Sequence, residues 1–307
     1  METDGYRQSD NVEDRRGSSF AGGSSGGVGM GTGGGLGIGA IIVIFLIAHF
    51  TGIDPRVLMG GAEAINNMRN GGQVQQNAYQ QDQPAPTQAN TNEADPMKRF
   101  VSIVLAQTED VWTKILPEQE NVQYTRPRLV LFSGSTPSGC GQAQTAMGPF
   151  YCPIDRKVYL DMSFFNDMKQ RYGGGGDFAY AYVIAHEVGH HVQNLLGILP
   201  KVQQMQENAP SEAVANGYSV KLELMADCLA GVWANNANQQ FKLLDPGDVE
   251  KALATAQAIG DDRLQQQARG YVVPDSFTHG SAAQRQQWLT TGLKTGQVDS
   301  CNTFKQQ

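Results

Sequence analysis

The stretch DFAYAYVIAHEVGHHVQNLL, residues Asp177–Leu196, decides the fold because it has the pattern of one long, largely buried helix. Asp177 is a suitable cap for the start of this helix, and Gly197 directly after the stretch is suited to end it. Between them, apolar residues predominate, and Val183, Ile184, Ala185 and Val188 surround the first polar residues. The sequence therefore predicts a helix that lies inside a folded domain.

The same helix carries the run HEVGH. His186 and His190 are four residues apart, so on a helix both project from one face, one turn apart, and can bind one metal ion. Glu187 lies beside them as the general base for a metal-activated water. The alternative is an amphipathic helix with surface histidines, but unpaired polar groups are costly in so apolar a stretch. The pattern favours a metal site.

A second helical run, YSVKLELMADCLAGVW at Tyr218–Trp233, carries two carboxylates four residues apart. Two buried carboxylates on one face repel each other unless cations or N–H donors compensate them. We expect Glu223 to be the third metal ligand and Asp227 to bind the second nitrogen of a ligand histidine. In the alternative interpretation, these carboxylates pair at the surface with Lys221 or a distant arginine.

Two histidines and one glutamate leave a fourth position for water, which is typical of catalytic rather than structural zinc. The predicted cofactor is therefore Zn²⁺, with Glu187 moving the proton during hydrolysis. A further donor is needed for the tetrahedral oxyanion, and His279 in SFTHGS is the candidate. The alternative role of His279 is that of a loop histidine that caps the helix following at Ser281.

Several motifs together resemble the bacterial membrane-anchored neutral zinc metallopeptidase family: HEVGHH, ELMADCLAGVW, DPGDVEKALATAQAIGDDRL and FTHGSAAQRQQWLTTG, with GCGQA, GPFYCP and VYLD before them. The resemblance covers residues 97–305. It implies a zincin-like fold and peptide-bond hydrolysis, and the Glu-x-x-x-Asp step is similar to that of gluzincins. It indicates no substrate beyond a protein or peptide.

The chain divides by composition into four parts. A disordered Gly/Ser-rich tail spans residues 1–35, and a transmembrane anchor spans residues 36–53. A flexible Gln/Asn-rich tether follows at residues 54–95, and the metallopeptidase domain spans residues 96–307. The last part begins with Asp95-Pro96, a good helix start. Short strands are predicted at Arg128–Ser133 and Lys157–Asp161, and mostly helices follow. The predicted fold class is α+β.

The anchor, LGIGAIIVIFLIAHFTGI, has no formal charge in 18 residues, which is near the lower limit for one membrane crossing. The basic residues on its two sides differ only slightly: Arg15 and Arg16 precede it, and Arg56 and Arg69 follow. Together with the cysteine content, this predicts a single-pass protein whose C-terminal domain lies outside the cytoplasm. The family resemblance implies that the membrane is the bacterial inner membrane.

Four cysteines, all in the C-terminal two thirds, fit two disulfides in an oxidising compartment. Buried reduced thiols are the alternative. Four cysteines allow three pairings; we favour Cys140–Cys152, closing a short loop, and Cys228–Cys301, tying the C-terminus to the Glu223 helix.

The remaining composition narrows the function classes. The formal net charge is −7, and no Lys/Arg-rich stripe is present, so a nucleic-acid partner is not expected. The predicted function is that of a zinc-dependent endopeptidase. Two alternatives stay open: a zinc-binding envelope scaffold without proteolytic activity, and a zinc hydrolase acting on something other than a peptide. The intact Glu187 argues against the scaffold. The sequence indicates no oligomeric state.

Overall fold

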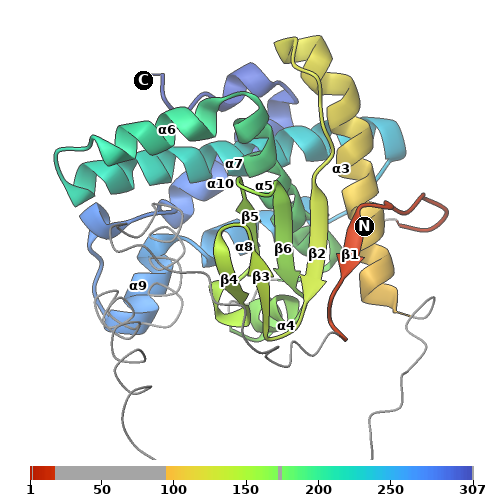
Figure 1. The fold of residues 1–307 in the computed structure, drawn as a ribbon, viewed down its shortest axis with the longest axis horizontal. Helices are drawn as coiled ribbons and strands as arrows, with labels where there is room; N and C mark the ends of the chain where they lie inside the picture. The colour runs from red at the N-terminus through yellow and green to blue at the C-terminus, as the bar shows by residue number, and fades with distance from the viewer. Residues whose placement is uncertain (2, 18–94, 172–174, 306–307) are drawn as a thin grey trace, which may run out of the picture.

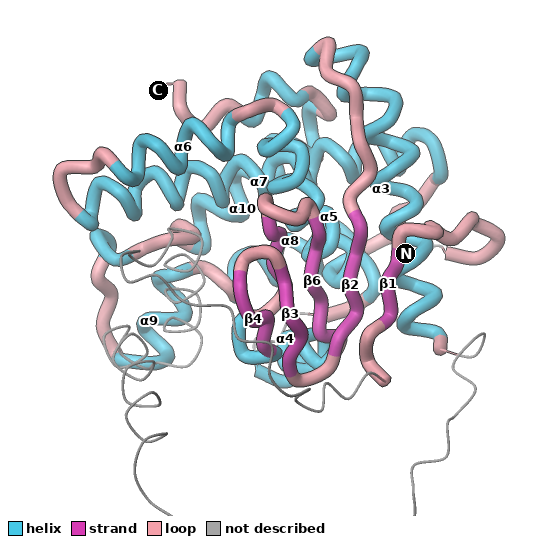
Figure 2. Tube along the Cα trace, in the orientation of Figure 1, coloured by secondary structure: helices cyan, strands magenta, loops and turns pink. Residues whose placement is uncertain are grey.

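The computed structural model describes residues 1, 3–17, 95–171 and 175–305, which form an α+β fold (Figure 1). The strands are β1 Val12–Asp14, β2 Arg128–Phe132, β3 Ser135–Ser138, β4 Gly141–Gln144, β5 Phe150–Cys152 and β6 Lys157–Asp161. The α-helices are α3 Pro96–Glu120, α4 Ser163–Arg171, α5 Asp177–Leu195, α6 Ile198–Glu207, α7 Glu212–Phe241, α8 Asp248–Ala258, α9 Asp261–Arg269 and α10 Ala282–Thr295. Figure 2 shows that strands dominate one part of the molecule and helices the rest.

The main sheet has the order β1-β2-β6-β5, and the hairpin β3-β4 forms a second, two-stranded sheet. Strands β1, β2 and β6 are parallel, while β5 runs antiparallel to β6 and forms an edge. The predicted strands at 128–133 and 157–161 correspond to β2 and β6.

Alternating side chains of β2 pack into two different hydrophobic cores. Leu129 and Leu131 join the main core, which includes residues of helices α3, α5 and α7. Val130 and Phe132 join a smaller core that includes Ala143 of the β3-β4 hairpin. Because successive residues of a strand point to opposite faces, the sheet has helices on one face and the hairpin on the other. Strand β6 follows the same rule, since Val158 and Leu160 join the main core and Tyr159 joins the smaller one.

Helix α3 begins as the sequence predicts. The Asp95 side chain accepts hydrogen bonds from the backbone N–H groups of Met97 and Lys98, both at 3.0 Å, and Pro96 occupies the first turn. A Pro at that position loses no helical hydrogen bond, and its fixed φ suits the helix.

The expectation of a disordered tail over residues 1–35 is wrong for residues 3–17. Strand β1 pairs in register with β2, and the residues before it bind the buried carboxylate of Glu109. Ser9 Oγ and Asn11 Nδ2 donate to Glu109 Oε1 at 2.6 and 2.7 Å, and Arg7 Nη2 donates to Oε2 at 3.0 Å. This segment is ordered by polar contacts to the domain, which a count of its apolar residues does not register.

The predicted anchor at 36–53 and nearly all of the tether at 54–95 lie outside the described residues. No helix within the described part of the chain combines the length and the apolarity needed to cross a bilayer. Strand β1, which precedes the predicted anchor and tether in the chain, pairs with β2, which follows them, in one sheet.

Candidate metal centre

Helix α5 presents the two histidines of the HEVGH run. It begins at Asp177, with Gly176 rather than Asp177 as the capping residue, and ends at Leu195 before Gly197, whose φ of 69° suits a residue without a side chain. His186 and His190 are buried, with 7% and 9% of their surface exposed. Their rings stand nearly perpendicular with centroids 4.9 Å apart. Both imidazoles therefore point into one enclosed site.

Helix α7 brings Glu223 to these imidazoles. Its Oε2 atom lies 3.0 Å from His186 Nε2 and 3.4 Å from His190 Nε2. The close approach of the helices depends on Gly189, since a Cβ there would lie 3.1 Å from the carbonyl oxygen of Ala226. A larger side chain at this position would push α7 away from the histidines.

The three donor groups fit zinc. All of their candidate ligand atoms lie within 4.8 Å of one another. Donors about 2.1 Å from a tetrahedral zinc ion are separated by about 3.4 Å, close to the two distances from Glu223 Oε2. Two imidazoles and one carboxylate also form a ligand set of catalytic zinc sites, whereas calcium and magnesium prefer oxygen donors. Within the described residues, this is the cluster that could hold a metal ion.

Asp227, one turn after Glu223, binds the other nitrogen of His186. The His186 Nδ1–H donates to Asp227 Oδ1 at 2.9 Å, which leaves Nε2 directed at Glu223. Burial lowers the pKa of His186, but the hydrogen bonds and charges of Asp227 and Glu223 outweigh burial and raise it to about 10. Asp227 thus fixes both the ring orientation and the tautomer.

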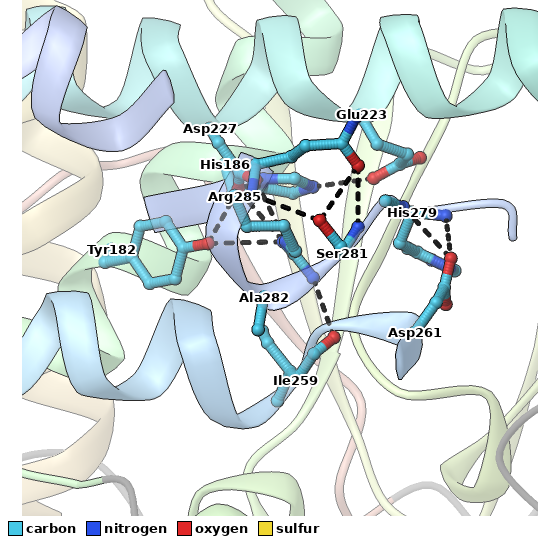
Figure 3. A network of polar contacts seen from close by, with 12 residues as sticks. Tyr182, His186, Glu223, Asp227, Ile259, Asp261, His279, Ser281, Ala282 and Arg285 are labelled. Atoms are coloured by element: carbon cyan, nitrogen blue, oxygen red, sulfur yellow. Dashed lines mark hydrogen bonds and ion pairs between the residues drawn. The ribbon is translucent and has the colours of Figure 1, made fainter. Parts of the chain in front are cut away.

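Arg285 of α10 completes this network; the sequence offered a distant arginine as a partner but did not identify it, and the pair with Asp227 is buried rather than at the surface. Its Nε and Nη2 atoms donate to the two oxygens of Asp227, each at 2.9 Å, and Nη1 donates to the Ile259 carbonyl at 3.3 Å (Figure 3). The Tyr182 hydroxyl donates to Asp227 at 2.6 Å. The only sequence signal for Arg285 was its position within the matched motif FTHGSAAQRQQWLTTG; local spacing could not pair it with a residue 58 positions earlier.

Glu187 is also buried and lines the same cleft as the metal ligands. Burial is the main cause that raises the pKa of its carboxyl group, while the neighbouring His186 and His190 lower it. The cleft has a volume of about 180 Å³. Apart from the ligands, its walls are mainly apolar and come from several elements, including Met147, Phe150, Phe164, Val183, Leu199 and Leu222.

His279 lines this cleft as well, in the turn that precedes α10. The carboxylate of Asp261 holds that turn, because one of its oxygens accepts the backbone N–H groups of Thr278, His279 and Gly280 at 2.7–3.0 Å. Its other oxygen lies 3.6 Å from His279 Nδ1. Burial lowers the pKa of His279, but Glu223 and Asp261 raise it, and the net shift is upward. Ser281 caps α10, so the alternative role suggested by the sequence belongs to Ser281 itself.

The four cysteines and His191 are not among the candidate metal ligands. Cys140 pairs with Cys152 and Cys228 with Cys301, the two pairings that the sequence analysis favoured. Cys228 follows Asp227 directly, so the second disulfide joins the ligand helix to the C-terminus. His191 points away from the metal ligands and is buried between Tyr151 and the carbonyl of Thr125.

Fold and site together define a protein with an HExxH helix and, on a second helix, a carboxylate that could complete a metal site. The comparison with family models is more specific: the model described as "Putative neutral zinc metallopeptidase" matches residues 1–304. The chain belongs to this family, as the sequence resemblance indicated. The match includes the residues of β1, in agreement with their place in the fold.

Relatives extend over most or all of the chain. It is 49% identical to the uncharacterized protein YpfJ of Escherichia coli strain K12, over 99% of both chains. It is 46% identical to the uncharacterized protein Rv2575 of Mycobacterium tuberculosis strain H37Rv, over 67% of this chain and 71% of that protein. No solved structure matches the chain.

Proposed function

We propose that the protein is a zinc-dependent endopeptidase that hydrolyses peptide bonds in a protein or peptide substrate. The observation that carries the proposal is the meeting of His186, His190 and Glu223 from two helices, with Glu187 in the same cleft. A zinc ion held there would polarise the scissile carbonyl and lower the pKa of a water molecule.

Each polar residue of the cleft has a task in this chemistry. Glu187 takes the proton from the attacking water and passes it to the leaving amine, for which a carboxyl pKa raised by burial is suitable. His279 lines the same cleft and donates a hydrogen bond to the developing oxyanion. Asp227, supported by Arg285, keeps His186 in the required tautomer.

The edge strand β5 favours a peptide over other hydrolysable substrates. Phe150 and Tyr151 of β5 line the cleft, and among the residues that the structure describes only one side of β5 is paired in the main sheet. An extended peptide can add to such an edge through main-chain hydrogen bonds, while the apolar walls accept its side chains. This supports an endopeptidase over a hydrolase of small molecules, and the buried Glu187 supports an enzyme over a scaffold.

The two disulfides support a location outside the cytoplasm, because such bonds persist in oxidising compartments. We place residues 3–17 there together with the rest of the domain, since β1 belongs to its sheet. Association with the bacterial inner membrane through the apolar run at 36–53 stays a prediction.

The test uses the full chain, purified from an oxidising compartment, with and without Glu187→Gln. We expect one zinc per chain in both proteins by mass spectrometry. Cleavage of an unfolded protein substrate should be abolished by a chelator and should fall by about 10²-fold or more in the variant. Glu207→Gln, on the exposed surface of α6, is the matched control and should cleave normally. Zinc bound without any cleavage by the native chain would favour the scaffold, and cleavage retained by Glu187→Gln would refute the assigned base.

A further inference from the structure

Gln193 lies between the two helices that supply the metal ligands. It is fully buried on α5, one turn after His190. Its Oε1 atom is 2.9 Å from His190 Nδ1, and its Nε2 atom donates to the backbone carbonyl of Leu222 at 2.7 Å. Leu222 directly precedes Glu223 in α7. One side chain therefore contacts a ligand histidine and the residue next to the ligand carboxylate.

The chemistry of these partners fixes which way the amide points. A backbone carbonyl can only accept hydrogen bonds, so the NH₂ group of Gln193 must face Leu222. The amide oxygen is then left to face His190 Nδ1, and an amide oxygen can only accept. Nδ1 must therefore carry a hydrogen atom. The lone pair of His190 is confined to Nε2, the nitrogen that lies 3.4 Å from Glu223 Oε2.

We propose that Gln193 is a positioning residue of the metal centre. It holds His190 in the Nδ1–H tautomer and ties the HEVGH helix to the helix that carries Glu223. Asp227 performs the equivalent task for His186 with a carboxylate. A carboxylate there needs a cation such as Arg285 beside it, whereas the neutral amide orients His190 and adds no buried charge. The inference rests on the proposed zinc site.

The experiment measures zinc affinity of the full chain by competition with a chromophoric chelator. Gln193→Met keeps the length of the side chain and removes both hydrogen bonds, and we expect a 10–100-fold weaker affinity, typical for the loss of a group that orients a ligand. Gln204→Met, at an exposed position of the adjacent α6, is the matched control and should bind zinc like the native chain.

A second readout separates this role from general packing. In the zinc-loaded native protein, ¹⁵N-correlated NMR should show a slowly exchanging proton on His190 Nδ1, and this proton should exchange faster in Gln193→Met. If Gln193→Met does not fold, Gln193→Glu decides the matter: its carboxylate can still accept from Nδ1, but it has no hydrogen for Leu222. That variant should keep the ring proton and bind zinc more weakly.

The outcomes are distinguishable from failure of the proposed function. A native chain that takes up no zinc would refute the zinc site itself. A native chain that binds zinc, together with a folded Gln193→Met or Gln193→Glu of unchanged affinity and unchanged ring-proton exchange, would overturn the role of Gln193. Zinc bound through Nδ1 of His190 would do the same.

Discussion

Replacing Arg285 tests whether the buried carboxylate of Asp227, which orients His186, depends on a charge supplied by α10. Arg285 is 4% exposed, and Asp227 is fully buried. In Arg285→Met, Asp227 loses two hydrogen bonds of 2.9 Å and its only arginine partner within the described residues, and the Ile259 carbonyl loses a donor. Breaking a buried ion pair in this way costs about 3–5 kcal/mol. Asp227 keeps Tyr182 and His186, so we expect about 3 kcal/mol, the lower end of that range.

The assay is equilibrium unfolding in urea, with a chelator present so that metal binding does not contribute to the free energy. At about 2–3 kcal/mol per M, the expected loss lowers the midpoint by about 1–1.5 M. Arg263→Met, at an exposed position of α9, is the matched control and should change the stability by less than about 0.5 kcal/mol. A loss below about 1 kcal/mol for Arg285→Met would show that Asp227 does not rely on Arg285, and the reasoning would fail.

Three further predictions concern pH, packing and topology. The pKa of His186 is raised from 6.5 to about 10. Without metal, its contribution to the free energy of unfolding is therefore complete below pH 6.5 and is lost as the pH rises toward 10. The urea midpoint should accordingly fall over this pH range. Because protons compete with the metal for this imidazole, the apparent zinc affinity should rise over the same range. Gly292→Ala should destabilise the protein by about 2 kcal/mol, because the new Cβ would lie 2.7 Å from Val232 N and closer still to the Cys228 carbonyl; thermal unfolding measures this. Single cysteines introduced at exposed positions in residues 3–10 and 262–270 should react with a membrane-impermeant reagent from the same side of the membrane, and labelling from opposite sides would contradict the pairing of β1 with β2.

Local patterns predicted the parts of the site that lie within one helix. The spacing of His186 and His190, and of Glu223 and Asp227, follows from helical geometry, and the structure brings these residues together. The start of α3 was likewise predicted from two adjacent residues, the capping Asp95 and Pro96 in the first turn. These features are short-range, so the sequence near them contains the information that determines them.

Long-range features required the structure. Arg285 reaches Asp227 across 58 residues, and Ser9 reaches Glu109 across 100. No periodicity marks either pair. Composition was misleading for residues 3–17, because this segment gains much of its order from hydrogen bonds and ion pairs with α3 and from the pairing of β1 with β2. A polar segment can belong to a fold when the partner surface already holds a buried charge in need of donors.

The C-terminal helices are best understood as the support of the second ligand helix. Gly231 and Gly292 lie where α7 and α10 cross, with no room for a side chain on either. This contact places Arg285 beside Asp227, and the Cys228–Cys301 disulfide joins α7 to the C-terminal end one residue further on. Arg285 of α10 binds the carboxylate of Asp227, and the disulfide fixes the adjacent Cys228. Since Asp227 orients His186, and Glu223 lies one turn before it, loosening α10 should weaken the metal centre without altering any ligand.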